Sequence, residues 1–133
     1  MNYFLDTNIC IYFLKGLYPN IKEMIEQTPP ENIKIASIVK AELLFGVENS
    51  SRKKRNFESL HKFLLPFEII PFDDKATDFY SRIRFDLAKK GKLIGPNDLI
   101  LASTVLAYEG ILVSNNITEF ARVKNLNVEN WIK

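Results

Sequence analysis

The chain has 133 residues, of which 47% are hydrophobic and 26% are charged, and its formal net charge at pH 7 is +2. This length suits one domain with its own core, and the composition excludes an intrinsically disordered protein. A single cysteine, Cys10, and a single histidine, His61, exclude an internal disulfide and a zinc site built from Cys and His. No apolar run approaches the roughly 20 residues needed to cross a bilayer, and no signal-peptide pattern is present, so we expect a cytoplasmic protein without a membrane anchor.

The first half of the chain predicts two strands and four helices. Glycine and proline mark several of the expected helix ends, because both residues interrupt regular helical structure. In chain order, the elements are a strand at 3–5, a helix ending at Gly16, a helix from Pro19 to Pro29, a strand at 33–36, a helix from Ser37 as its N-cap to about Val47, and a helix at 51–65 with Phe57, Leu60 and Leu64 at helical spacing.

The clearest helix of the second half runs from Asp73 to Lys90. Two aspartates favour its start, and its apolar stripe consists of Ala76, Phe79 or Tyr80, Ile83 and Leu87. The remaining elements are a strand at 67–70, a nearly all-apolar helix from Pro96 to about Tyr108, a strand at 111–113 and, as a candidate fifth strand, residues 126–128.

Strands that alternate with helices predict an α/β domain, in which helices cover both faces of a mainly parallel sheet of four or five strands. Ligands bind such sheets at the carboxyl ends of their strands. Asp6 directly follows the first strand, and the segment 114–116 directly follows the fourth. We therefore expect both segments on the same rim of the sheet.

Three carboxylates, Asp6, Glu42 and Asp98, each stand alone inside an apolar run. A lone carboxylate is costly to bury, so such residues are usually exposed, paired or bound to a metal. Each has a structural alternative. Asp6 could cap the helix that follows the first strand, Asp98 lies where a helix dipole favours negative charge, and Glu42 could lie on the exposed side of an amphipathic helix.

Convergence of these acids would need a counter-charge. Two carboxylates about 4 Å apart repel by roughly 4 kcal/mol at an effective dielectric near 20. A hard divalent cation removes this conflict, and oxygen ligands suit Mg²⁺ or Mn²⁺. Because Mg²⁺ usually keeps waters and phosphates among its ligands, an open acidic site of this kind favours phosphoryl chemistry.

The other candidate groups have simpler interpretations. His61 shares a predicted helical face with Phe57 and Leu64, which favours packing at the edge of the core, and the apolar surroundings of Cys10 also indicate packing. The basic run 52–55 could meet nucleic acid, although a solvated helix start is the commoner explanation. The chain contains no Gly-rich phosphate loop, nucleophile elbow or dinucleotide-binding fingerprint.

Four motifs, in order, resemble those of the PIN-domain ribonucleases, and most of all the VapC toxins of prokaryotic toxin–antitoxin pairs. They are Asp6-Thr7-Asn8 after a strand, Ala41-Glu42-Leu43-Leu44-Phe45-Gly46, Pro96-Asn97-Asp98-Leu99-Ile100-Leu101-Ala102, and Val113-Ser114-Asn115-Asn116 with Glu119-Phe120. The resemblance implies one PIN-like domain over 1–133 with a three-layer α/β/α fold. It also implies a Mg²⁺- or Mn²⁺-dependent endoribonuclease.

Residue by residue, Asp6 and Asp98 match the metal-binding aspartates of the family, and Glu42 matches its central glutamate. Thr7, Ser114, Asn116 and Glu119 fall at supporting positions. Many PIN domains have a fourth acid where this chain has Asn116, and a threonine where it has Ser114. Glu119 could substitute for the missing acid, and Asn116 could ligate through its carbonyl oxygen. We therefore expect three carboxylates around a single firmly held metal.

The resemblance also implies partners. VapC-type toxins usually form homodimers and are held inactive by a cognate VapB-type antitoxin that docks over the site. Their substrates are specific sites in structured RNAs, often transfer RNA or ribosomal RNA.

Two other functions remain open. One is a catalytically silent PIN-like module that binds RNA or protein. The other is a phosphatase of the haloacid-dehalogenase type, which also has an aspartate after its first strand. That family needs a second aspartate two residues later, and Asn8 occupies this position, which argues against a phosphatase of this type.

Overall fold

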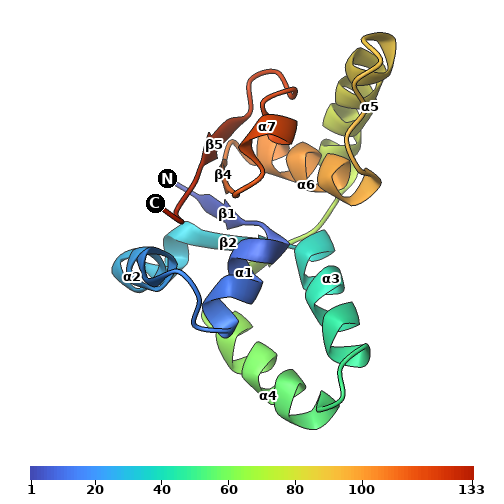
Figure 1. Ribbon diagram of the computed structural model, residues 1–133. Coiled ribbons are helices and arrows are strands. Elements are labelled where there is room, and N and C mark those ends of the chain that lie inside the picture. Colours follow the sequence, from blue (N-terminus) through green and yellow to red (C-terminus); the bar gives the residue numbers. More distant parts are fainter.

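A five-stranded, wholly parallel β-sheet forms the middle of the molecule (Figure 1). The computed structural model describes all residues from 1 to 133. The strand order is β3-β2-β1-β4-β5. The strands are β1 (Tyr3–Leu5), β2 (Ile33–Ala36), β3 (Glu68–Ile70), β4 (Ile111–Val113) and β5 (Asn127–Glu129). The predicted parallel sheet is therefore confirmed, with β5 beginning one residue later than expected.

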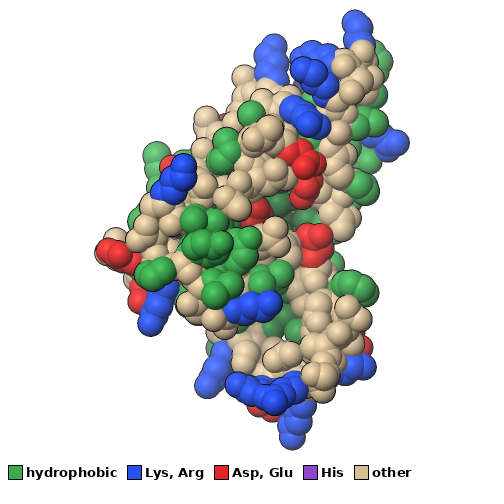
Figure 2. Space-filling view, viewed as in Figure 1, with side chains coloured by type: hydrophobic (Ala, Val, Ile, Leu, Met, Phe, Trp, Pro, Cys, Tyr) green, Lys and Arg blue, Asp and Glu red, His purple; other side chains and the backbone are tan.

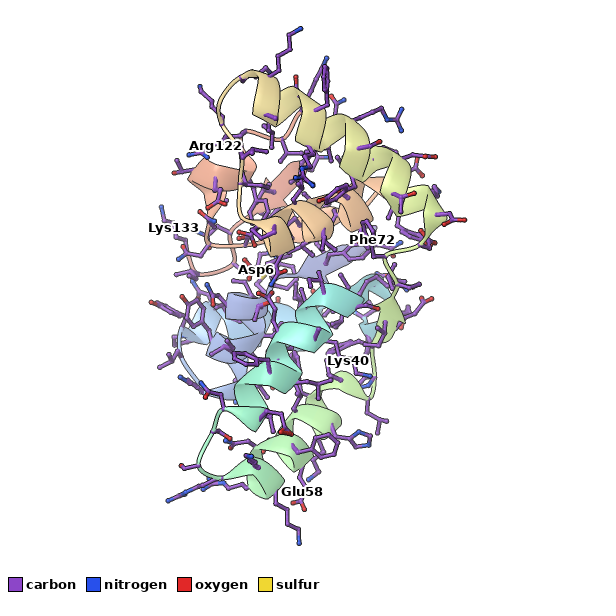
Figure 3. All side chains as sticks on the ribbon, turned by 90° about the vertical axis from the view of Figure 1, so that its right-hand side faces the viewer. Asp6, Lys40, Glu58, Phe72, Arg122 and Lys133 are labelled. Carbon is purple, nitrogen blue, oxygen red and sulfur yellow. The ribbon has the colours of Figure 1, made fainter.

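Seven α-helices cover the two faces of the sheet. They are α1 (Thr7–Leu14), α2 (Pro19–Gln27), α3 (Ser37–Glu48), α4 (Lys53–Leu64), α5 (Asp74–Lys89), α6 (Pro96–Ala107) and α7 (Ile117–Phe120), with a 3₁₀ turn, η1 (Pro30–Asn32), before β2. Helices α1 to α4 form one group, and α5 to α7 form another on the opposite side of the strands (Figures 1 and 3). This arrangement confirms the expected three-layer α/β/α fold. No helix is both long and apolar enough to cross a membrane.

The central strands are mainly apolar on both sides, with Lys34 of β2 as an exception, because helices pack on both sides of them. Phe4 and Leu5 of β1, Ile33 and Ile35 of β2, and Leu112 of β4 are fully buried. Strands buried on both faces are expected to be continuous apolar runs rather than alternating ones. Three of the predicted strands, at 3–5, 33–36 and 111–113, accordingly match the structure at both ends.

Helix α6 is almost entirely apolar because it lies between the sheet and α5. It contacts α5 along its length and also packs on β2 and β4. Seven of its residues are buried: Leu99, Leu101, Ala102, Ser103, Thr104, Val105 and Ala107. Both buried hydroxyls are satisfied within the helix, since Ser103 donates to the carbonyl of Leu99 and Thr104 to that of Ile100. Burial of α6 fixes its first turn, which carries Asp98, at the edge of the sheet.

The N-cap of α3 was predicted wrongly. Ala36, the last residue of β2, occupies the cap position, and no side chain caps the helix. Ser37 is already the first helical residue, because the chain turns directly from strand into helix. The short helix α7 was not predicted, and a helix of four residues is too brief to establish a periodic pattern.

The packed face of α4 also differs from the prediction. Leu60 and Phe63 are buried, whereas Phe57 is 51% exposed. His61 is exposed and stacks on the Phe57 ring, with ring centroids 6.2 Å apart. The interpretation of His61 as a residue at the edge of the core is therefore wrong. Cys10 is fully buried in the core, as expected.

A glycine before β4 is required by close packing against β1. A Cβ atom added at Gly110 would lie 2.5 Å from two ring carbons of Phe4 and 3.2 Å from the carbonyl oxygen of Asn2. Because the Phe4 ring is fully buried, it cannot swing aside into solvent. We predict that Gly110→Ala lowers the free energy of unfolding by about 1–3 kcal/mol in urea denaturation, the usual cost of overpacking.

A matched control is Gly46→Ala, because a Cβ atom at Gly46 in α3 would meet nothing within 4 Å. This change should be neutral or stabilise the protein by about 0.5–1 kcal/mol, since alanine favours helix over glycine. Equal stabilities for the two variants would contradict the packing described at Gly110.

Candidate active site

Asp6 lies at the carboxyl end of the central strand and has two structural connections there. Its backbone N–H donates to the carbonyl oxygen of Val113 at 3.0 Å, which joins it to β4. Its side-chain Oδ1 accepts from the backbone N–H of Ile9 at 2.9 Å and so caps α1. Asp6 is therefore the N-cap that the sequence allowed, and the same geometry holds its carboxylate in place at the rim of the sheet.

Burial dominates the electrostatics of Asp6, whose side chain is almost inaccessible. The loss of hydration raises the pKa of its carboxyl above the ordinary value, and the negative charge of Glu42 raises it further. Hydrogen bonding from Ser114 and from the backbone of Ile9 opposes this shift. The charge of Asp6 is thus held by neutral donors, without a salt bridge to a cation.

Glu42 is half-buried and points across the site from α3. Its Oε1 accepts from the hydroxyl of Thr7 at 2.6 Å, and its Oε2 accepts from the side-chain amide of Asn97 at 3.2 Å. These bonds connect α3 to the first turns of both α1 and α6. Glu42 is therefore not a freely solvated side chain on an amphipathic helix, since both of its oxygens are directed into the rim.

Asp98 lies in the first turn of α6, where a helix dipole would by itself favour its charged form. Its pKa is nevertheless raised to about 6. Burial is the largest cause, followed by repulsion from the carboxylates of Glu119, Glu42 and Asp6. Burial and the charges of three neighbouring carboxylates therefore outweigh the effect of the helix dipole on the pKa of Asp98.

Glu119, in α7, completes the acidic group. It accepts from the backbone N–H of Gly95 at 3.1 Å and from the side-chain amide of Asn116 at 3.0 Å. The Asn116 hydrogen bond is the main reason that the pKa of Glu119 is lowered. Asn116 in turn donates its backbone N–H to the hydroxyl of Ser114, a fully buried residue, at 2.9 Å.

All seven residues singled out in the sequence thus lie around one rim: Asp6, Thr7, Glu42, Asp98, Ser114, Asn116 and Glu119. Asp6 lies between the two helical groups of the molecule (Figure 3). On the face shown in Figure 2, acidic side chains gather near the middle, and Lys and Arg side chains lie mainly toward the two ends. Sequence reasoning missed Asn97 and Gly95, which orient Glu42 and Glu119. The Asn97 amide beside Asp98 in the Pro96-Asn97-Asp98 turn was the available signal.

The donor set fits a divalent cation in an open site. No three Asp, Glu, His or Cys side chains are spaced to enclose an ion by themselves. Mg²⁺, however, commonly uses one or two carboxylates and keeps several waters. The four carboxylates make no salt bridge to Lys or Arg, although the nearby charge of Arg122 helps to lower the pKa of Glu119. They provide the oxygen ligands and the negative charge that such an ion needs.

The raised pKa of Asp98 predicts a stability effect with a definite sign. In protein without metal, the folded state holds this proton more tightly than the unfolded chain, so the contribution of Asp98 turns against folding as pH rises from about 4 through 6. We predict that Asp98→Asn in EDTA is more stable than wild type by about 1 kcal/mol at pH 7.5, after discounting for solvent screening of this half-buried group, and equally stable near pH 4. Urea denaturation at both pH values measures this.

Asp78→Asn provides the control, because Asp78 is exposed on α5. Its effect should be small and similar at both pH values. A loss of stability in Asp98→Asn at pH 7.5 would contradict the repulsion described at the site.

Comparison with known proteins agrees with this fold. Residues 3–126 match the model of the PIN domain. The chain is 45% identical to "Ribonuclease VapC2" of Rickettsia felis over the whole of both chains. It is 31% identical to the "tRNA(fMet)-specific endonuclease VapC" of Salmonella typhimurium over 98% of each chain.

A solved structure extends the comparison to three dimensions. The chain superimposes with a TM-score of 0.93 on a chain in the crystal structure of VapBC2 from Rickettsia felis bound to a DNA fragment from their promoter. The two chains share 44% of their residues, and the match covers 98% of this chain and 99% of the other. From this agreement over its whole length, the chain belongs to the PIN-domain family and, within that family, to the VapC-type ribonucleases.

Proposed function

We propose that this protein is the toxin of a toxin–antitoxin pair and acts as a metal-dependent endoribonuclease that hydrolyses phosphodiester bonds in structured RNA. The observation that carries the proposal is the convergence of Asp6, Glu42, Asp98 and Glu119 at one end of the sheet. No buried ion pair neutralises this charge. A purely structural role would not explain this concentration of negative charge, whereas binding of a cation would.

Asp6 and Asp98 would hold Mg²⁺ or Mn²⁺, and Glu42 would bind the ion directly or through water. A bound ion of this kind would activate a water molecule and stabilise the charge that develops on the phosphate. Thr7 and Asn97 fix the orientation of Glu42, so that its oxygens are in place before substrate arrives. Ser114 supports the charge of the buried Asp6.

The role of the fourth acid, which many PIN domains have at the position of Asn116, is better assigned to Glu119. Asn116 donates its side-chain amide to Glu119 and thereby keeps that carboxylate charged. Its role in this interpretation is to position Glu119. The sequence predicted three carboxylates around one metal. With Glu119 as a fourth carboxylate, the ion could also be bound through a water molecule on the side of α7.

The named relatives support the class of substrate and partner. One is called a tRNA(fMet)-specific endonuclease, and solved structures of others are complexes of VapB with VapC. We infer that this chain acts on transfer RNA or a comparably structured RNA and is bound by a VapB-type antitoxin.

The direct test is cleavage of total cellular RNA by the purified chain. We predict Mg²⁺- or Mn²⁺-dependent cleavage that EDTA abolishes, with Asp6→Asn and Asp98→Asn each reducing the rate about 100- to 1,000-fold. Asparagine is chosen at position 6 because it caps a helix about as well as aspartate, whereas alanine would also remove the α1 cap. Circular dichroism should show that both variants remain folded.

Asp74→Asn, in the exposed first turn of α5, is the matched control and should cleave like wild type. Wild-type rates for both site variants would overturn the assignment of the metal ligands. Binding of RNA by the wild-type chain, with no cleavage in either metal, would favour the catalytically silent module instead.

A further inference from the structure

A groove runs away from the acidic rim between α1, α3 and α4. Glu42 lines its inner end, so the groove is continuous with the candidate active site. Its apolar floor includes Leu43, Val47 and Leu60. Lys15 at the end of α1 and Arg55 in α4 line the other parts of its wall. The groove thus changes from acidic at the rim to basic farther out.

The two cations of the groove are free to bind a ligand. The salt bridges of the structure join Lys34 to Glu68, Lys53 to Glu48 and Lys90 to Asp86, and none involves Lys15 or Arg55. Two further lining residues, Asn56 and Ser59, carry exposed side-chain donors. In Figure 2, Lys and Arg side chains gather at the lower end of the molecule, over α4. These groups together offer positive charge and open donors on one surface.

The length and chemistry of the groove suit a nucleic-acid strand. The groove follows α3 from Glu42 past Val47 and reaches Ser50 just beyond the end of the helix. At 1.5 Å per helical residue this span is on the order of 10 Å. That length accommodates about three stacked nucleotides at roughly 3.4 Å each. Free cations and amide or hydroxyl donors bind phosphates and ribose hydroxyls, while an apolar floor can contact the faces of unpaired bases.

We propose that the groove between α1, α3 and α4 binds the RNA strand next to the scissile phosphate, with Arg55 and Lys15 contacting its phosphates. This inference rests on the proposed ribonuclease function. An RNA strand with one phosphate at the acidic rim must continue across the surface beyond the rim. This groove leads from Glu42 to Lys15 and Arg55, which form no salt bridge within the protein. Arg55 and Lys15 are binding and positioning residues in this scheme, since they lie outside the group that would hold the metal.

Gly46 allows a sharp test because it lines the groove on α3 and a Cβ atom there would meet nothing within 4 Å. Gly46→Glu adds a carboxylate to the groove and Gly46→Lys adds a cation of similar length, and both changes raise helix propensity over glycine. Binding is measured by fluorescence anisotropy with a fluorescein-labelled, single-stranded 20-nucleotide RNA in EDTA, which prevents cleavage. We expect the Lys variant to bind on the order of tenfold more tightly than the Glu variant at low salt.

Removing the natural cations should change the salt dependence. The logarithm of the binding constant falls with the logarithm of salt by about 0.7 for each phosphate contact to a single strand. Arg55→Ala and Lys15→Ala should each reduce this slope by about that amount. Lys62→Ala, also exposed on α4 but outside the groove, should leave the slope unchanged.

The control for net charge is a second pair of variants at an exposed helical position away from the groove. Ala88→Glu and Ala88→Lys, near the end of α5, should differ by less than about twofold in RNA affinity. Equal affinities for the two Gly46 variants, or no measurable RNA binding by wild type, would overturn the proposal and leave the groove to a protein partner.

The same proteins separate this inference from the proposed function. If the Gly46 variants differ in RNA binding but wild type cleaves no RNA with Mg²⁺ or Mn²⁺, RNA binding by the groove is supported and the proposed ribonuclease function is wrong. If wild type cleaves RNA but the Gly46 variants bind alike, the function holds and the groove fails.

Discussion

Mutual repulsion among acidic side chains at the carboxyl ends of β1 and β4 is the constraint on which the rest of this site depends. The charges of three other carboxylates help to raise the pKa of Asp98 to about 6. A chain that brings acids together in this way loses stability in the absence of a counter-ion. The stabilisation that offsets this loss must come from a bound ligand. A divalent cation that also binds waters and phosphate oxygens matches the negative charge and the oxygen ligands of the site.

The fold tolerates this repulsion by surrounding the acids with neutral donors. Backbone N–H groups of Ile9 and Gly95 hold Asp6 and Glu119. The side chains of Thr7, Asn97 and Asn116 hold Glu42 and Glu119. Donors of this kind fix the positions of the oxygens and leave their charge intact, whereas a lysine or arginine would cancel it. Orientation and negative potential are therefore both retained, which is the combination that metal-assisted phosphoryl chemistry requires.

Much of this arrangement could be predicted from the sequence because it follows from local patterns. The mainly apolar segments at 3–5, 33–36 and 111–113 predicted three strands. The isolation of Glu42 among apolar neighbours was the main indication of a shared acidic site. Topology then placed Asp6 and Ser114 on one rim. Asp6 also showed that two interpretations could hold together, since the same carboxylate caps α1 and faces the site.

What the sequence could not reveal depends on how distant elements pack. Asn97 reaches Glu42 across 55 positions of the chain, and nothing local in either segment specifies that contact. Phe57 and His61 are exposed because the face of α4 that packs on the domain is the one that carries Leu60 and Phe63. The groove beside Glu42 likewise arises from three helices, and only in the folded chain does Arg55, part of an otherwise ordinary basic run, line the same surface as an active-site acid.

The central claim is that a divalent cation resolves the crowding of the carboxylates, and calorimetric titration of the purified protein with Mn²⁺ tests it most directly. Titrations in buffers of different ionisation enthalpy give the number of protons released per ion bound. With the pKa of Asp98 at about 6, binding should release about half a proton at pH 6 and almost none at pH 8. Absence of Mn²⁺ binding, or binding with no proton release at pH 6, would contradict this account.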